Sequence, residues 1–493
     1  MTKLHLIPYP DKVNITCGYT VSNPPVREFF SDELGPEAYR LLISEKEIFI
    51  EGNTTGIFYA HCTLKQLQLQ FGDSLPCMEI EDAPRFPYRS FMLDSSRHFL
   101  PKEEVLRLLD ILAFFKINKL HWHLIDDQGF RVEIAAFPKL TEIGAKRGRS
   151  HFGLVDEYKN NCGYFTKSDV QEIVAYAKER MIDIIPEIEI PGHESALLAA
   201  YPEIGCQNAP VEVVTTGGIF DNLICAGKEE SFTFITKILD ELIELFPYEM
   251  IHIGGDEACK RKWRACPDCQ KKIKDLGLKD ENALQQWFVV KIHDYLRSKG
   301  KTSVVWNDSL RGEKLPTDFV VQMWMGDIDL IKDFTSRGGK IIQSTTTTHY
   351  LDYPYGEWDA KALLNSDPYP DFLKDADSVI GIECPLWTER VVDIERAFYL
   401  MLPRLPAMAE CAWTSKASRD NKSFCDRYET IAEYFKTQGI EGAPREYWFI
   451  SPELAKQDKD AHHQMIYTPE YSAEMERQEA MMAVEREIYG DER

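Results

Sequence analysis

The 493-residue chain carries a formal net charge of −23, with 80 acidic against 57 basic residues, and 44% of its residues are hydrophobic. The acidic balance argues against DNA or RNA as a partner, because binding to a polyanion depends on basic patches. No apolar run of about 18 residues is present, which argues against a membrane span, and the length exceeds that of one ordinary core, so two or more domains are expected.

Twelve cysteines are spread along the chain. The start, MTKLHLIPYPDKV, has neither a long apolar core nor a small-residue cleavage pattern, so we expect no signal peptide, a cytoplasmic location and reduced thiols. Cys259, Cys266 and Cys269 gather in one segment, the last two as Cys-Pro-Asp-Cys. Structural zinc needs four ligands, and the nearby sequence offers three cysteines and no close histidine. We therefore expect no metal and no other cofactor.

Residues 1–87 are predicted to form a short α/β domain. Apolar and polar residues alternate at 39–44 and 47–51, as they do in strands, and residues 56–70 have the apolar face of a helix. Pro84 and Pro87 mark the end of this domain.

From about residue 88, strand-like apolar runs recur, and most of the intervals between them have helical patterns. The runs cover residues 90–97, 119–126, 182–190, 250–257, 302–308, 319–326, 340–347 and 378–387. Eight such strands with crossovers predict an α/β fold, a parallel (β/α)8 TIM barrel over residues 88–440. An open doubly wound sheet is the alternative.

The ends of these runs favour the barrel. Polar and aromatic side chains stand at the C-terminal end of nearly every run, at Arg97, Asp126, His193, Asp256, Glu257, Asp308, Trp387 and Glu389. In a barrel those ends form a single face, where catalysis occurs, whereas an open sheet would spread them along an edge.

Residues 441–493 are expected to form a helical C-terminal tail. Residues 469–489 are rich in Glu, Met and Ala, which favours a helix. We expect this helix to be exposed to solvent, or packed on the barrel or on a neighbouring molecule, rather than to act in function.

The stretch MIHIGGDE at 250–257 ends a buried strand with two glycines and two adjacent carboxylates. Glycines allow another group to approach the backbone closely. The like charges of Asp256 and Glu257 push one pKa up, so that one carboxyl group can act as a general acid while its ionised neighbour stabilises positive charge. That pair suits cleavage of an acetal through an oxocarbenium-like transition state. A helix N-terminus that simply favours acidic residues is the alternative.

Aromatic residues near the strand ends support catalysis. Trp306, Trp324 and Trp387 each end a different strand. Tryptophans scattered through a core usually only pack, but three at one barrel mouth beside carboxylates suit a flat-walled pocket for a sugar or an N-acetyl group. Tyr350 and Asp352 follow the seventh strand and can add hydrogen bonds there.

These residues together resemble a known family. HIGGDE at 252–257 closely resembles the signature of family-20 glycoside hydrolases, the β-N-acetylhexosaminidases, and the resemblance extends over most of residues 37–440. Six motifs occur in the family's order: LDSSRHFLP at 93–101, HWHLIDDQGF at 121–130, PGH at 191–193, HIGGDE, the triplet Tyr350-Leu-Asp352, and LWTE at 386–389.

The resemblance implies a retaining exo-β-N-acetylhexosaminidase that hydrolyses terminal β-linked N-acetylglucosamine or N-acetylgalactosamine from a glycan or glycoconjugate. The oxygen of the substrate's own 2-acetamido group attacks C1 and forms an oxazolinium intermediate, which water opens. The implied roles are general acid and base for Glu257, orientation and charge stabilisation for Asp256, donation to the acetamido oxygen for Tyr350, and support of the acid for Asp126 and His193. Trp306, Trp324 and Trp387 would wall the acetamido pocket, and Arg97, Asp352 and Glu389 would hold sugar hydroxyls.

The N-terminal domain departs from the family pattern. The family usually has a longer α/β domain between its opening strand, here near residues 4–8, and the strand that starts at Tyr39. Ser90 also stands where the family commonly has glycine. Neither change touches the implied site.

Two other classes of protein fit part of the sequence. In a metal-dependent hydrolase, His121 and His123 on one strand face would bind metal with His193, His252 and Asp126, but barrel amidohydrolases carry this pattern on the first strand rather than the second. A non-catalytic sugar-binding barrel would keep the tryptophans and lose the acid, yet Glu257 is present. Barrels of this size often associate, which leaves a homodimer open.

Overall fold

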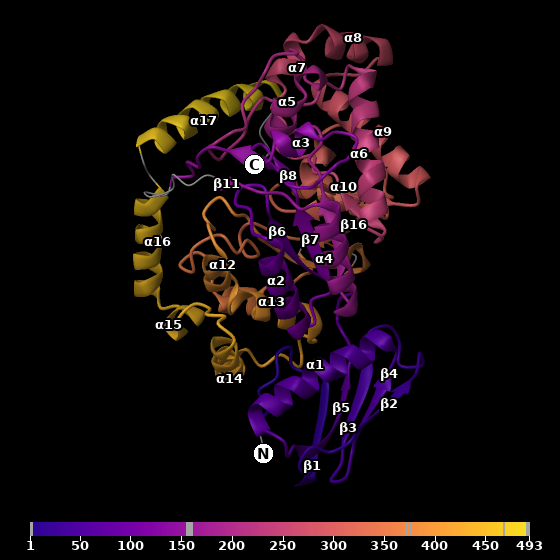
Figure 1. Ribbon diagram of the computed structural model, residues 1–493, viewed down its shortest axis with the longest axis vertical. Coiled ribbons are helices and arrows are strands. Elements are labelled where there is room, and N and C mark those ends of the chain that lie inside the picture. Colours follow the sequence, from indigo (N-terminus) through magenta and orange to yellow (C-terminus); the bar gives the residue numbers. More distant parts are fainter. Residues whose placement is uncertain (1–2, 154–160, 371, 374–375, 467–468, 490–493) are drawn as a thin grey trace.

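Figure 1 shows a computed structural model of the chain, which describes residues 3–153, 161–370, 372–373, 376–466 and 469–489. A sheet with one helix lies at the end of the molecule that holds the N-terminus. A closed barrel with its surrounding helices fills the centre, and the last helices of the chain run along one side of it.

The N-terminal sheet has the strand order β1-β5-β3-β4-β2, and helix α1 (Thr54–Phe71) packs on it. Leu41 and Ile50 lie in one buried cluster with Leu64 of α1, as the alternation of the strands predicts. The Asn53 side chain caps the helix by accepting the backbone N–H of Gly56. The strands are β1 (Lys12–Tyr19), β2 (Val26–Phe30), β3 (Tyr39–Ile43), β4 (Ile48–Gly52) and β5 (Pro76–Asp82).

Residues 4–8, which we expected to be the opening strand, belong to no strand. The buried segment is hydrogen-bonded to side chains of α1 instead: the backbone N–H of Ile7 donates to Gln66 Oε1 (2.8 Å), and Gln66 Nε2 donates to the Ile7 carbonyl (2.7 Å). Pro8 and Pro10 have no N–H group to offer a sheet, so a ladder could not continue along this segment.

The eight-stranded parallel barrel is confirmed, and the open doubly wound sheet is wrong. The strands neighbour one another in chain order, and β17 closes the barrel on β6 with Leu386 opposite Leu93. The barrel strands are β6 (Tyr88–Asp94), β7 (Lys119–His123), β12 (Asp183–Glu187), β13 (Met250–His252), β14 (Thr302–Trp306), β15 (Val320–Met323), β16 (Lys340–Gln343) and β17 (Val379–Leu386).

Helices follow most barrel strands and pack an apolar stripe against them. Val105, Leu108, Leu109 and Leu112, for example, are buried on one side of α2. The helices up to the end of the barrel are α2 (Lys102–Phe114), α3 (Lys139–Glu142), α4 (Lys167–Glu179), α5 (Ser195–Ala200), α6 (Glu229–Leu245), α7 (Arg261–Ala265), α8 (Pro267–Leu276), α9 (Glu281–Ser298), α10 (Ile328–Ser336), α11 (Ala360–Asn365), α12 (Ile394–Met401) and α13 (Arg404–Trp413).

Short elements occupy the connections. Two small strand pairs are β8 (Ile125–Asp126) with β9 (Gly129–Phe130) and β10 (Lys146–Arg147) with β11 (Asn161–Cys162). Single 3-10 turns are η1 (Pro202–Ile204), η2 (Asn307–Arg311), η3 (Ala376–Ser378) and η4 (Asn421–Ser423).

The C-terminal region is helical, and the helix predicted at 469–489 is confirmed with the same bounds. It lies against connections of the barrel: the buried Gln478 side chain donates to the Gly217 carbonyl (3.1 Å) and accepts the backbone N–H of Ile219 (2.9 Å). The helices are α14 (Phe424–Thr437), α15 (Arg445–Trp448), α16 (Pro452–Ile466) and α17 (Pro469–Tyr489). Within the described ranges, every helix is too short or too polar to cross a membrane.

Candidate active site

A cavity of about 210 Å³ opens at the C-terminal ends of the barrel strands. Each of the eight strands contributes at least one lining residue at or after its C-terminal end, because parallel strands in a barrel end on the same face. The lining includes every site residue that the sequence predicted: Arg97, Asp126, His193, Asp256, Glu257, Trp306, Trp324, Tyr350, Asp352, Trp387 and Glu389. Gly218, Tyr353 and Arg390 complete it, and sequence reasoning missed these three.

Four aromatic rings form a box inside this cavity. The centroid of the Trp306 ring lies 6.4 Å from that of Trp324 and 6.0 Å from that of Trp387. Tyr350 closes the box, with its ring centroid 6.5 Å from Trp324 and 6.3 Å from Trp387. Such a ring of flat apolar walls with one hydroxyl suits a small planar group that has both apolar and polar atoms.

The turn after β13, which carries the paired carboxylates, has a left-handed backbone at three residues. Residues other than glycine rarely adopt this conformation. Gly254 (φ 63°) and Gly255 (φ 99°) are left-handed, and so is Glu257 (φ 46°). A Cβ atom on Gly254 would lie 1.8 Å from the Glu189 carboxylate, and one on Gly255 would lie 2.2 Å from Ser309 Oγ. The two glycines are therefore required by close approach of other side chains of the protein. A left-handed non-glycine residue costs energy, and such residues cluster at functional sites.

Asp256 is held in an environment that opposes its charge. Burial raises the pKa of Asp256 to about 7. Nearby His193 lowers this pKa, whereas the Asp308 and Glu257 carboxylates raise it. Its Oδ1 atom has no hydrogen-bond partner among the described residues. The carboxyl group is thus positioned to be stabilised by a donor or a positive charge that enters the cavity.

A histidine links the carboxylates at the mouth to a second acidic pair. His193 Nε2 lies 3.6 Å from Glu257 Oε2, and on its other side Nδ1 lies 3.1 Å from Asp127 Oδ2 and 3.4 Å from Asp126 Oδ1. Although burial disfavours the charged ring, Asp126 and Asp127 raise the pKa of His193 well above its usual range. The nearer carboxylate is Asp127, which is not among the predicted site residues, although it directly follows Asp126 in HLIDDQGF.

Two further polar residues, Arg97 and Asp352, line the cavity. Arg97 is ion-paired with Asp126 (2.8 Å) and lies over the Trp387 ring, with its guanidinium carbon 4.9 Å from the ring centroid. Asp352 is half-buried, and burial of its carboxyl group raises its pKa to about 7; its Oδ1 atom has no partner among the described residues. A guanidinium and an unsatisfied carboxyl group are suitable partners for sugar hydroxyls.

Residues 86–416 match the catalytic domain of glycosyl hydrolase family 20, and residues 3–83 match domain 2 of the same family. The chain belongs to glycosyl hydrolase family 20. It therefore carries the catalytic domain of a glycoside hydrolase of the β-hexosaminidase type.

Relatives of known name and structure agree with this family. The chain is 36% identical over 431 residues to a beta-hexosaminidase of Porphyromonas gingivalis. The matched region covers 83% of this chain but only 54% of that protein. It is 34% identical to a beta-hexosaminidase of Akkermansia muciniphila over 84% of this chain and 88% of that protein. The crystal structure of the beta-N-acetylhexosaminidase from Bacteroides fragilis is similar with a TM-score of 0.81 and 29% identity, covering 90% of this chain and 99% of that one.

Beneath the cavity, the family-20 barrel contains a layer of paired histidines and glutamates. His121 lies 2.9 Å from Glu383 and 3.0 Å from Glu187, and His252 Nδ1 lies 2.7 Å from the other Glu187 oxygen. Trp306 Nε1 donates to Glu187 (2.8 Å). The His-Trp-His pattern therefore supports the floor of the aromatic box through Glu187, which was missed in the sequence because it lies inside a strand.

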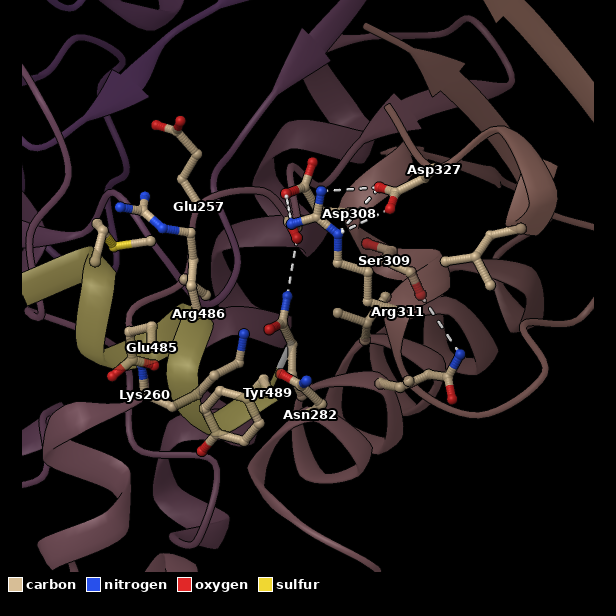
Figure 2. Close-up of a pocket in the computed structure, with 18 residues that line it drawn as sticks. Glu257, Lys260, Asn282, Asp308, Ser309, Arg311, Asp327, Glu485, Arg486 and Tyr489 are labelled. Atoms are coloured by element: carbon tan, nitrogen blue, oxygen red, sulfur yellow. Dashed lines mark hydrogen bonds and ion pairs between the residues drawn. The ribbon is translucent and has the colours of Figure 1, made fainter. Parts of the chain in front are cut away.

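A second cavity of about 390 Å³ adjoins the family-20 site on the side of α17. Figure 2 shows Lys260, Glu485 and Tyr489 on one side of it, and Asp308, Arg311 and Asp327 on the other; the Glu257 carboxylate extends away from Lys260 and Tyr489. Arg311 is ion-paired with Asp308 and Asp327, each at 2.9 Å. Asp308 also accepts Trp324 Nε1 (2.7 Å), so this wall holds one side of the aromatic box.

The cysteines are grouped differently from the sequence prediction. The Sγ atoms of Cys266 and Cys269 lie together with those of Cys206 and Cys225, whereas Cys259 is not in this group. Cys206 and Cys225 lie in the connection between η1 and α6, far from the Cys-Pro-Asp-Cys segment in sequence. The expectation of only three neighbouring cysteines was therefore wrong, because two of the four members of the group come from a separate connection that packs beside the Cys-Pro-Asp-Cys segment.

Proposed function

We propose that the chain is a retaining exo-β-N-acetylhexosaminidase that releases terminal β-linked N-acetylglucosamine or N-acetylgalactosamine by substrate-assisted catalysis. The observation that carries the proposal is the aromatic box of Trp306, Trp324, Trp387 and Tyr350 beside two adjacent carboxylates. A box of this shape can hold the methyl group and the planar amide of a 2-acetamido substituent. The substituent's oxygen is then directed at the anomeric carbon.

In the first step Glu257 donates a proton to the glycosidic oxygen while the acetamido oxygen attacks C1. The bond from C1 to the leaving oxygen breaks, the aglycone leaves as an alcohol, and an oxazolinium ring forms with its positive charge shared with the amide nitrogen. Tyr350 donates to the acetamido oxygen and orients it. The protein supplies no nucleophile, so the rate depends on how closely the pocket positions the substrate's own group.

Asp256 acts on the nitrogen of the same substituent. Without substrate, burial raises the pKa of Asp256 to about 7. An amide N–H that becomes positively charged at the transition state favours the carboxylate form of a partner, so the interaction is stronger in the transition state than in the ground state. The unpartnered Oδ1 atom provides the acceptor for that N–H.

In the second step Glu257, now a carboxylate, takes a proton from water, and the water oxygen bonds to C1 on the face that the aglycone left. The oxazolinium ring opens and the acetamide is restored, so the configuration at C1 is retained. His193, with Asp127 and Asp126 behind it, places a positive charge 3.6 Å from Glu257 and positions its carboxylate through both steps.

Exo action is supported by the size and floor of the cavity. Its volume of about 210 Å³ is below the roughly 300–1,000 Å³ of drug-sized sites and suits a single sugar residue. The histidine–glutamate layer closes it from below, so that a chain could not pass through. Arg97, Asp352 and Glu389 would hold the hydroxyls of that terminal sugar.

The test uses matched aryl glycosides. We expect release of the phenol from aryl N-acetyl-β-glucosaminide and aryl N-acetyl-β-galactosaminide, and none from the aryl β-glucoside, which lacks the acetamido group. Proton NMR of the early product should show the β-anomer, and a thiazoline mimic of the oxazolinium ring should inhibit. A sugar covalently bound to a side chain, or equal cleavage of the β-glucoside, would contradict the substrate-assisted scheme.

A further inference from the structure

Four cysteine side chains converge between two connections at the C-terminal side of the barrel. Cys225 Sγ lies 3.6 Å from Cys269 Sγ and 3.7 Å from Cys266 Sγ, and Cys206 Sγ lies 3.8 Å from Cys269 Sγ. All four sulfur atoms lie within 4.8 Å of one another. Cys225, Cys266 and Cys269 are buried and Cys206 is partly exposed.

These separations fit sulfur atoms that surround one metal ion. Zinc–thiolate bonds are about 2.3 Å long, so the edges of a tetrahedron of four sulfurs around zinc are about 3.8 Å long. A disulfide would instead bring two sulfurs to about 2.05 Å, and all twelve cysteines are free. Cys77, Cys259 and Cys384 are also buried but belong to no group of metal-ligand atoms within the described residues.

We propose that Cys206, Cys225, Cys266 and Cys269 bind one structural zinc ion. Protein sulfur fills all four positions of the tetrahedron, which leaves none open for a reacting water or substrate. The site is thus distinct in kind from the catalytic cavity, where the described lining contains no cysteine.

The backbone on one side of the cluster favours thiolates. Cys266 is the residue before the first turn of α8, Pro267 begins the helix and Cys269 lies in its first turn. The positive end of a helix dipole stabilises a negatively charged sulfur, such as a thiolate bound to a metal ion. This pair therefore supplies two of the four ligands from one rigid element.

The other two ligands are brought together by a strand-like bridge. Gly205 and Ile224 pair as an antiparallel bridge, which holds the segments that carry Cys206 and Cys225 against each other, and the two sulfur atoms belong to the same group. The Cys225 N–H also donates to the Ile204 carbonyl (3.0 Å). Sequence spacing alone gives no sign of this pairing, since the two cysteines lie in an irregular connection.

Gly227 shows that the two halves meet closely. A Cβ atom there would lie 2.3 Å from the carbonyl carbon of Asp268 and 2.4 Å from the nitrogen of Cys269. The glycine therefore lets the segment that carries Cys225 lie directly against the start of α8, which carries Cys269.

A zinc ion at this position would fasten together the connections that follow β12 and β13. The first carries His193 and the second carries Asp256 and Glu257. Trp263 Nε1 donates to the Ile224 carbonyl (3.0 Å) and joins the same two connections. Loss of the ion should therefore lower thermal stability while leaving every reacting group in the chain.

The first experiment measures metal in the full-length protein, purified under reducing conditions without chelator. We expect one zinc per chain by elemental analysis after dialysis. Cobalt loaded in its place should give the intense visible bands of a tetrahedral cobalt–thiolate centre, which added zinc should abolish. Neither readout uses substrate, so both stay valid whether or not the proposed glycosidase activity is found.

The second experiment uses serine variants of the ligands with a matched control. Cys206→Ser and Cys225→Ser should weaken zinc retention in a competition with a chelator. The loss should exceed the roughly 10–100-fold that follows from removing a residue that only hydrogen-bonds to a metal ligand. Cys259→Ser removes a buried thiol from the same segment and should keep one zinc per chain. Removal of zinc should lower the melting temperature of wild-type protein and leave that of Cys225→Ser unchanged.

Four results would overturn the proposal. The first is wild-type protein that takes up no zinc when it is reduced and supplied with the metal, and the second is one iron per chain in place of zinc. The third is a thiol titration in denaturant that finds fewer than twelve free cysteines in protein kept reduced. The fourth is a folded ligand variant that retains zinc as wild type does. If the ligand variants do not fold, the metal content and the cobalt spectrum of wild-type protein decide alone.

Discussion

The catalytic cavity and the cysteine cluster lie on neighbouring connections of the same barrel, yet their polar groups are arranged in opposite ways. In the cavity, Asp256 and Asp352 each leave one buried oxygen without a partner among the described residues, and burial raises the pKa of each to about 7. In the cluster, each sulfur faces other sulfurs. Groups that face a cavity unpaired are suited to an incoming substrate, whereas groups that face one another are suited to an ion held permanently.

The largest expected effect is that of Glu257→Gln. Loss of the proposed general acid and base should lower kcat on a natural N-acetylated disaccharide by about 10²–10⁴-fold, with little change in substrate binding. Steady-state kinetics and calorimetric binding of the product measure the two quantities. The variant should keep the zinc content of wild type, which separates the two regions.

A matched control for this variant is Glu230→Gln, since Glu230 is an exposed residue of α6. It should have wild-type kinetics. Near wild-type turnover in Glu257→Gln would show that another group is the acid.

The sequence predicted the cavity well because its residues follow strand ends. Once eight parallel strands are recognised, their C-terminal ends must meet on one face, so Arg97, Asp256 and Trp387 could be placed together without coordinates. Motifs such as HIGGDE also keep neighbouring site residues contiguous. Asp127 was missed only because its neighbour Asp126 filled the expected role.

The cysteine cluster could not be predicted in the same way. Cys266 and Cys269 form a recognisable pair, but their partners lie in an irregular connection whose course depends on one bridge, Gly205 to Ile224. Residues 4–8 are a similar case, because side chains of α1 replace the sheet partner that a strand would have needed. Periodicity carries information about regular elements, and long-range contacts between loops lie outside it.

A smaller effect on activity and an opposite effect on stability are expected for Asp256→Asn. Removing the charge that is proposed to stabilise the oxazolinium ion should lower kcat by about 10²-fold. Stability should rise, because the native state holds this carboxyl group at a pKa of about 7 while the unfolded chain has an ordinary one near about 4. Between these two pKa values the native wild-type protein binds more protons than the unfolded chain, so its stability falls as the pH rises. The destabilisation caused by the Asp256 charge is complete above a pH of about 7.

The measurement is thermal unfolding of both proteins at pH 5 and pH 8. The difference in melting temperature between Asp256→Asn and wild type should favour the variant more at pH 8 than at pH 5, by on the order of a few degrees. Comparing the two proteins at each pH cancels the titration of other groups, apart from those that contact Asp256. An equal difference at both values would show that burial does not raise this pKa.

The smallest effect tests how the C-terminal helix contributes to the cavity. Gln478 of α17 hydrogen-bonds to Gly217 and Ile219 on either side of Gly218, which lines the cavity. Gln478→Ala removes these bonds, and a net cost of about 1 kcal/mol for each should loosen the connection and raise KM by about 2- to 10-fold. The kcat should change little, because Glu257 and the aromatic box do not contact this residue in the described interactions.

Val484→Ala, at an exposed position of the same helix, is the matched control and should leave KM unchanged. A loss of kcat in Gln478→Ala without a change in KM would mean that α17 acts on the carboxylates rather than on substrate binding. In that case the chemistry would depend on contacts of α17 that no motif of the barrel encodes. The residues at the strand ends would then not be sufficient to explain catalysis without the surrounding loops and helix.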